Sequence, residues 1–101
     1  MMNNKFVKVY PNVKKGKNCN FYEFSIIGLP VSNSKDCKTI IGDNALVRSH
    51  TVIYCGNIIG NNFTTGHFVL IREFNEINDN VSIGSNSVEH NTKIGNGVRI
   101  H

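Results

Sequence analysis

An Ile or Val at every sixth position is the feature that most restricts how this chain can fold. Counting in sixes from residue 41 reaches eight positions, and seven of them are Ile or Val: Ile41, Val47, Ile53, Ile59, Thr65, Ile71, Ile77 and Ile83. Apolar residues recur about every 3.6 positions in an amphipathic helix and every 2 in a half-buried strand, so neither element alone gives a period of six. The pattern predicts a chain of stacked six-residue units, each too small to bury its apolar face alone.

Other positions of the six-residue unit repeat as well. The fourth residue after each marker is mostly small or apolar, as in Ala45, Thr51 and Val69. The third residue after it is mostly Asn or Gly, which tolerate left-handed backbone angles. Each unit is therefore expected to form a short strand with one buried branched residue, followed by a turn. His50, Phe68 and Phe74 occupy this turn position, so we expect His50 to be structural and the two phenylalanines to lie outside.

The period is interrupted twice. Weaker markers begin at Val9, and Ile27 and Ile41 lie fourteen residues apart, two more than two units, so a loop excursion is expected near residues 29–36, where turn-forming residues gather. Near the end, Val88 and its successors keep the six-residue step. Ile83 and Val88 are only five apart, so one residue is missing between these two markers.

The repeat resembles the hexapeptide of acyltransferases with a left-handed parallel β-helix. In that family three hexapeptides form one triangular coil, and the coils stack with their markers inside. The resemblance implies an all-β fold of about five coils and a single domain over residues 1–101, with C-terminal coils and a cap apparently missing. It also implies an acyl-CoA-dependent enzyme that works as a homotrimer, with active sites in grooves between subunits and a histidine as general base.

Residues 48–54 and 65–73 resemble the sugar-acetyltransferase branch of this family, which includes N-acetyltransferases of nucleotide-linked amino sugars. The second stretch reads Thr65-Gly66-His67-Phe68-Val69-Leu70-Ile71-Arg72-Glu73. The resemblance implies acetyl-CoA as the donor and a sugar as the acceptor. His67 is the first candidate for the base, because imidazole accepts a proton near neutral pH. The alternative is a surface or interface histidine that only forms hydrogen bonds.

His90 is the second candidate base. The run Ser87-Val88-Glu89-His90 resembles S-V-x-E-H of another sugar N-acetyltransferase branch, although one residue before the Glu is missing. If a coil has eighteen residues, as the family implies, the missing residue places His90 beside Glu73, which would orient its ring or raise its pKa. The same count places Arg72 near Glu89. Arg72 and Glu73 are candidates for substrate binding, since a guanidinium can hold a phosphate or carboxylate. A plain ion pair is the alternative for both.

Two other functions remain to be weighed. Gly66-His67 resembles the start of the G-H-x-x-x-x-H ligand pair of β-helical carbonic anhydrases. Arg72 occupies the position of the second histidine and cannot bind zinc, so no metal cofactor is expected. The other alternative is a non-catalytic or truncated β-helix module without a donor site, because related enzymes grip coenzyme A with later coils.

Composition narrows the surroundings in which the protein works. The 101 residues carry a formal net charge of +4 without an Arg-rich arm, so neither nucleic acid nor a membrane is an expected partner. The first residues lack the apolar stretch of a secretory signal, which favours a cytoplasmic protein. Cys19, Cys37 and Cys55 are odd in number and contain no C-x-x-C, so reduced thiols are expected rather than a disulfide framework or a zinc site.

Overall fold

Fifteen strands of two to four residues make up three parallel sheets in the computed structural model, which describes residues 6–31 and 37–101. Sheet A contains β1 (Lys8–Val9), β4 (Ile26–Leu29), β7 (Val52–Tyr54), β10 (Leu70–Ile71) and β13 (Val88–Glu89). Sheet B contains β2 (Val13–Lys15), β5 (Thr39–Ile41), β8 (Ile58–Ile59), β11 (Glu76–Ile77) and β14 (Lys93–Ile94). Sheet C contains β3 (Asn20–Phe21), β6 (Leu46–Val47), β9 (Thr64–Thr65), β12 (Ser82–Ile83) and β15 (Arg99–Ile100).

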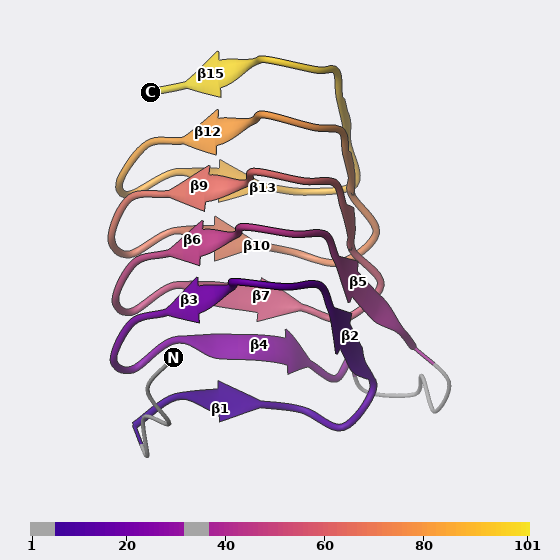
Figure 1. The fold of residues 1–101 in the computed structure, drawn as a ribbon, viewed down its shortest axis with the longest axis vertical. Coiled ribbons are helices and arrows are strands. Elements are labelled where there is room, and N and C mark those ends of the chain that lie inside the picture. Colours follow the sequence, from indigo (N-terminus) through magenta and orange to yellow (C-terminus); the bar gives the residue numbers. More distant parts are fainter. Residues whose placement is uncertain (1–5, 32–36) are drawn as a thin grey trace.

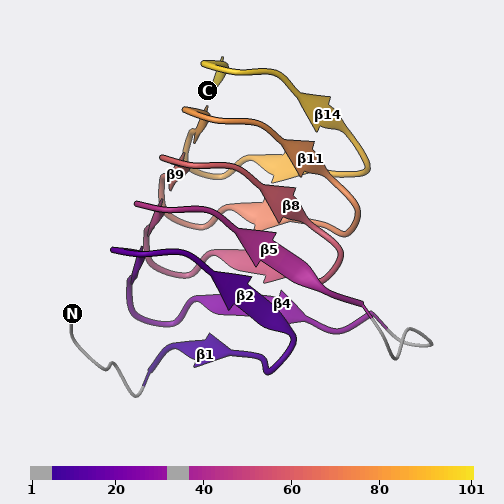
Figure 2. The same ribbon diagram turned by 45° about the vertical axis from the view of Figure 1, so that its right-hand side comes forward.

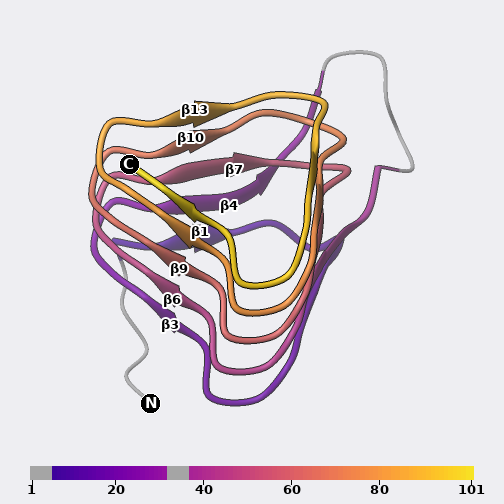
Figure 3. The same ribbon diagram turned by 90° about the horizontal axis from the view of Figure 1, so that it is seen from above.

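Successive strands enter sheets A, B and C in turn, and every third strand pairs in parallel with its predecessor in the same sheet. The stacked strands of sheet C are seen in Figure 1 and those of sheet B in Figure 2. Viewed from above, the coils have three sides (Figure 3). This is a left-handed parallel β-helix of five coils, so the predicted fold is confirmed. None of the residues described forms a helix of the length and apolarity that crossing a membrane requires.

A column of buried aliphatic side chains runs through the interior of the stacked coils. Ile53 and Ile71 occupy equivalent positions in successive coils and are fully buried, as is Ile27 in the coil before them. The residue two positions before each marker also points inward, so the interior contains Phe63 and Val81 as well. Burying one such side chain contributes about 1.5–3 kcal/mol. The stack of branched residues is therefore the principal source of stability.

The turns adopt the left-handed backbone conformation that the sequence predicts. Asn44, His50, Phe68 and Phe74 have φ values of 63°, 59°, 57° and 63°, and the equivalent Asn62, Asn80 and Asn86 behave alike. In the turns between sheets B and C, the asparagine side chains form a ladder of hydrogen bonds, in which each Nδ2 donates to the Oδ1 of the asparagine in the next coil. The turn phenylalanines are more than half exposed, as expected.

The first interruption of the period is larger than the sequence analysis predicted. Ile27 lies in sheet A and Ile41 in sheet B, the very next side, so fourteen positions take the place of six and the insertion has eight residues rather than two. Part of it is a bulge at Gly28, whose φ of +83° suits glycine. The predicted excursion over 29–36 lies partly outside the described residues. Two backbone hydrogen bonds anchor its flanks, because the N–H of Cys55 donates to Leu29 O and the N–H of Gly56 donates to Lys38 O.

The second interruption lies one unit later than predicted. Val88 was expected to be a buried marker, but it is 63% exposed, and Glu89 pairs in register with Ile71. Side chains alternate along a strand, so Glu89 takes the inward position that Ile holds in the coil below. The turn that follows Glu89 is one residue shorter than the equivalent turns after β7 and β10, and Asn91 in it adopts a φ of 48°. Partial burial raises the pKa of the Glu89 carboxyl.

The expectation of three reduced cysteines is wrong for two of them. Cys37 and Cys55 form a disulfide with a Cα–Cα distance of 5.6 Å, while Cys19 is a buried free thiol. Counting cysteines could not reveal this pair, because the insertion brings Cys37 back beside the end of β7. Disulfides persist mainly in oxidising compartments. The cytoplasmic location therefore stays a prediction.

Replacing Ile59 by Ala should lower the free energy of unfolding by about 2–5 kcal/mol, because the side chain is 2% exposed and leaves a cavity. Its neighbour Ile58 is the matched control, since it is 53% exposed on the outer face of the same strand. Ile58→Ala should cost less than about 1 kcal/mol. Urea unfolding followed by circular dichroism measures both, and equal losses would contradict the inward column.

Replacing Glu89 by Gln should stabilise the protein in a pH-dependent way. A carboxyl whose folded pKa is raised favours folding when protonated, and that contribution is lost as pH rises through the folded pKa. The variant should match the wild type below the ordinary pKa of 4.5 and exceed it at about pH 7. Urea unfolding at the two pH values tests this. A constant difference would show that the charge of Glu89 is not the cause.

Reducing the disulfide should destabilise the fold by about 3 kcal/mol, the effect expected for a crosslink between residues 18 apart. Thermal unfolding with and without dithiothreitol measures it, and the Cys37→Ser/Cys55→Ser variant should show no further response to the reductant. Thiol alkylation in denaturant should label one cysteine before reduction and three after it. Three labelled thiols without reductant would rule out the bond.

Candidate functional site

His67 lies on an exposed turn between sheets C and A. It follows β9, and its ring is held by the coil below, where Ser49 Oγ lies 2.8 Å from Nδ1. Its backbone N–H donates to Ser85 Oγ of the coil above at 2.9 Å. Both contacts fix the residue, and the described residues offer no hydrogen bond to Nε2. The ring is therefore oriented through Nδ1, and the side chain as a whole is exposed.

Gly66 allows this close packing. A Cβ atom at Gly66 would collide with Ser85, so only glycine fits between the two coils. The carbonyl of Gly66 accepts a hydrogen bond from the buried Thr51 Oγ1 at 3.3 Å. Thr65, the one marker that is neither Ile nor Val, is fully buried and accepts a bond from Arg48 N at 3.1 Å. Inward hydroxyl groups thus secure the backbone that carries His67.

A column of aromatic rings runs beside His67 along the same corner. Phe6, Phe24, His50 and Phe68 follow one another at centroid distances of 5.4, 5.1 and 4.6 Å. The three phenylalanines are 51–57% exposed. His50 is stacked between two rings, which agrees with a structural role. The column places an apolar strip next to the candidate base.

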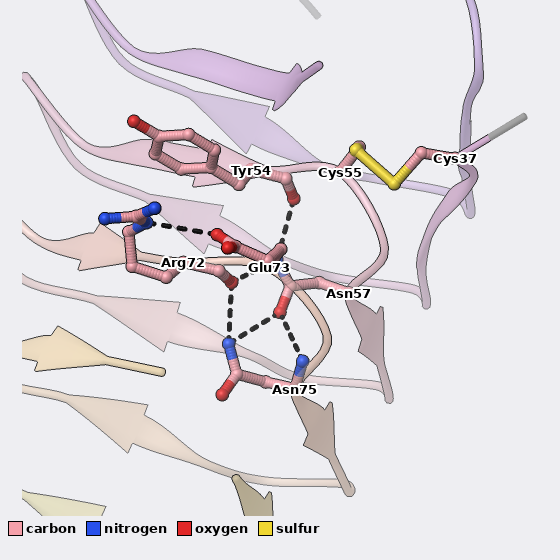
Figure 4. A network of polar contacts seen from close by, with 7 residues as sticks. All are labelled: Cys37, Tyr54, Cys55, Asn57, Arg72, Glu73 and Asn75. Atoms are coloured by element: carbon pink, nitrogen blue, oxygen red, sulfur yellow. Dashed lines mark hydrogen bonds and ion pairs between the residues drawn. A yellow bond between two sulfur atoms is a disulfide. The ribbon is translucent and has the colours of Figure 1, made fainter. Parts of the chain in front are cut away.

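Arg72, Glu73 and Tyr54 form a second group at the other end of the outer face of sheet A. Arg72 Nε donates to Glu73 Oε1 at 3.0 Å, and the guanidinium carbon lies 4.7 Å from the centre of the Tyr54 ring (Figure 4). A backbone hydrogen bond, the bond from Arg72 and the charge of nearby His90 hold the pKa of Glu73 below its ordinary value, against partial burial. Ile71 pairs with Glu89, so in register His90 follows over Arg72 and not over Glu73 as the sequence analysis predicted, although its charge still acts on the Glu73 carboxyl.

Two buried asparagines hold this second group in place from inside the coil. Asn57 Nδ2 donates to the carbonyls of Tyr54 and Arg72 at 2.7 and 2.8 Å, and its Oδ1 accepts from Asn75 Nδ2 at 2.8 Å (Figure 4). Asn75 Nδ2 also donates to Arg72 O at 2.7 Å. The sequence analysis missed both asparagines and Tyr54. The signal was present, because two polar residues 18 apart interrupt an inward column of mostly apolar and small residues.

The predicted site residues therefore fall into two groups. His67 lies before β10, while Arg72, Glu73 and His90 gather beyond its end. His67 and Arg72 are five positions apart on either side of β10, which corresponds to at most roughly 15 Å along the chain. One chain does not bring the first candidate base and the candidate binding residues together. Among the residues described, no group of three or more His, Cys, Asp or Glu is arranged to hold a metal ion.

Comparisons with known proteins give a match in structure and none in sequence. No family model matches the chain, and no curated protein matches it. Its fold is similar to the crystal structure of a maltose O-acetyltransferase from Clostridium difficile 630, with a TM-score of 0.70 and 23% sequence identity over 94% of this chain. The chain spans 58% of that protein's length. The similarity establishes a common β-helical fold.

Proposed function

We propose that this chain catalyses acetyl-CoA-dependent acetyl transfer to a hydroxyl or amino group of a sugar, either free or linked to a nucleotide. The observation that carries the proposal is the geometry of His67, an exposed residue whose Nδ1 is fixed by Ser49 and whose Nε2 has no hydrogen-bond partner among the described residues. The fold shared with a maltose O-acetyltransferase supports the reaction class. The resemblance of residues 65–73 to sugar acetyltransferases supports the class of acceptor.

In the proposed mechanism His67 is the general base. When Nδ1–H donates to Ser49 Oγ, Nε2 carries the lone pair and accepts the proton of the acceptor hydroxyl or amine. The acceptor oxygen or nitrogen then bonds to the thioester carbonyl carbon. A backbone N–H stabilises the resulting oxyanion. Collapse of the tetrahedral intermediate breaks the C–S bond, and the imidazolium returns its proton to the departing thiolate.

A homotrimer would unite the two groups of residues. His67 and the Arg72–Glu73 pair lie at opposite ends of β10. Copies arranged around a threefold axis parallel to the axis of the β-helix can therefore place one group of one copy against the other group of its neighbour. The exposed rings of Phe24 and Phe68 supply apolar surface at the corner that carries His67. In this arrangement Arg72 and Glu73 contact the sugar or a phosphate bound by the adjoining subunit.

His90 is the competing base within this proposal. It lies near Glu73, and a carboxylate beside an imidazole can orient it for proton transfer. Glu73 is already engaged by Arg72 at 3.0 Å, so its carboxylate is shared. His67 has a partner of its own in Ser49, which favours it as the base.

Replacing His67 by Gln should reduce kcat/KM for acetyl transfer by about 10²–10⁴-fold, the usual contribution of a general base. Release of coenzyme A thiol from acetyl-CoA measures the rate, with amino sugars, nucleotide-linked sugars and maltose as acceptors. Lys93→Gln is the control and should retain activity, because Lys93 lies on sheet B and its side chain is 84% exposed. Ser49→Ala should lower kcat and change the pH profile, because the ring loses its orientation.

The same assay separates the competing possibilities. A large loss in His90→Gln with full activity in His67→Gln would transfer the role of base to His90. An absence of turnover with every acceptor in a folded wild-type protein would reject the enzymatic proposal and favour the non-catalytic module. Sedimentation equilibrium, which gives the oligomeric mass directly, tests the trimer.

A further inference from the structure

We propose that a groove on the outer face of sheet C binds a phosphate ester or pyrophosphate group. The groove has a volume of about 260 Å³ and crosses the last four coils. Its floor consists of small and hydroxyl-bearing residues on the outer side of β9 and β12, namely Thr64, Gly66, Ser82 and Gly84. Neither the proposed base nor the Arg72–Glu73 pair lines it.

The glycines keep this floor flat. A Cβ atom at Gly84 would lie 2.9 Å from Ile100 O, and one at Gly66 would collide with Ser85. The coils are therefore packed directly against one another where the floor runs. The backbone N–H groups of Gly66 and Gly84 donate to the carbonyls of Ile83 and Ile100, so the floor offers a ligand the hydroxyl groups of Thr64 and Ser82.

Two arginines line opposite ends of the groove. Arg48 belongs to the second coil and Arg99 to the fifth, and their backbones are roughly 14 Å apart at the usual spacing between parallel strands. Arg48 Nη1 donates to Thr65 O at 3.0 Å, which holds the guanidinium across the sheet. A guanidinium fixed in this way loses less freedom on binding and still has donors for phosphate oxygens.

The charge of the groove is not neutralised within the part of the chain that the structure describes. Among the described residues, no side chain that lines the groove is acidic, and neither Arg48 nor Arg99 forms an ion pair with an acidic side chain. Asp79, at the turn before Ser82, uses Oδ1 to accept the backbone N–H of Asn61. Two cations above a floor of hydroxyl groups and glycines are suited to a ligand with two negative charges.

The groove adjoins the candidate base. Ser85 lines it, and Ser85 Oγ accepts the backbone N–H of His67 at 2.9 Å. Binding of the anion depends on the groove alone. Only the identity of the ligand rests on the proposed function, in which either coenzyme A or a nucleotide-linked sugar brings the phosphate close to the reacting group.

Calorimetric titration of the whole chain with inorganic pyrophosphate tests the groove. Arg48→Gln and Arg99→Gln should each weaken binding about tenfold, which matches the loss of one charge-assisted contact. Lys93→Gln is the control for net charge, since Lys93 lies on sheet B and is 84% exposed; it should change the dissociation constant less than about twofold. Because Arg48 also supports the fold, Arg99 and the amide NMR shifts of Ser82 and Ser85 provide an independent test.

No pyrophosphate binding, wild-type affinity in the Arg99 variant, or an equal loss in the Lys93 variant would overturn the inference. Competition of pyrophosphate with coenzyme A and with a uridine diphosphate amino sugar then identifies the source of the phosphate. Pyrophosphate binding without acetyl transfer would retain the groove and reject the proposed enzyme. Acetyl transfer with unaltered kinetics in both arginine variants and no binding would do the reverse.

Discussion

Stacking of branched aliphatic side chains at the spacing of parallel strands is the interaction on which the rest of this molecule depends. Ile53, Ile71 and their equivalents lie above one another in successive coils and leave almost no surface exposed. The strands are too short to be stable alone, because most contain only two residues. Each coil is therefore held in shape by the coils above and below it.

The same stacking decides where chemistry can take place. The inward positions are occupied by the core, so reactive side chains are restricted to the turns and the outer faces. His67 lies on a turn, and its ring and backbone are bonded to the adjacent coils through Ser49 and Ser85. Arg72 lies on an outer face, supported from inside by Asn57 and Asn75. A rigid lattice of backbone bonds thus replaces the loops that carry such residues in many other folds.

The period of six predicted short strands with a buried branched residue and left-handed turns, since these follow from which residues fit inside and which tolerate a positive φ. The β-helix and its five coils were implied by the resemblance of the repeat to a known hexapeptide. The period could not give the size of the insertion, because an eight-residue loop and a further irregular unit look alike in one sequence. It also assigned the inward position to Val88 in place of Glu89. Hydrophobicity favoured the valine, whereas the register set by the four preceding coils required the glutamate.

The candidate site was predictable only in part. The motif containing His67 and Arg72 stood out in the sequence. The count that placed His90 beside Glu73 assumed that the missing residue precedes Glu89, whereas it follows Glu89 and the register sets His90 over Arg72. The disulfide and the contact of Arg72 with Tyr54 depend on side-chain placement at a corner interrupted by the insertion. Arg48 and Arg99 are 51 positions apart and share no motif, so only the coiling of the chain reveals that they line one groove.

The buried pair Asn57 and Asn75 has a consequence for how faithfully the chain assembles. Aliphatic columns are nearly interchangeable, so a strand displaced by a whole turn of the solenoid would still cover apolar surface. Such a slipped arrangement would separate the two amides and leave each of them buried without a hydrogen-bond partner. The free-energy cost is about 1–3 kcal/mol for each unpaired group. The hydrogen-bonded pair therefore favours the native register of the coils over registers in which the coils are displaced.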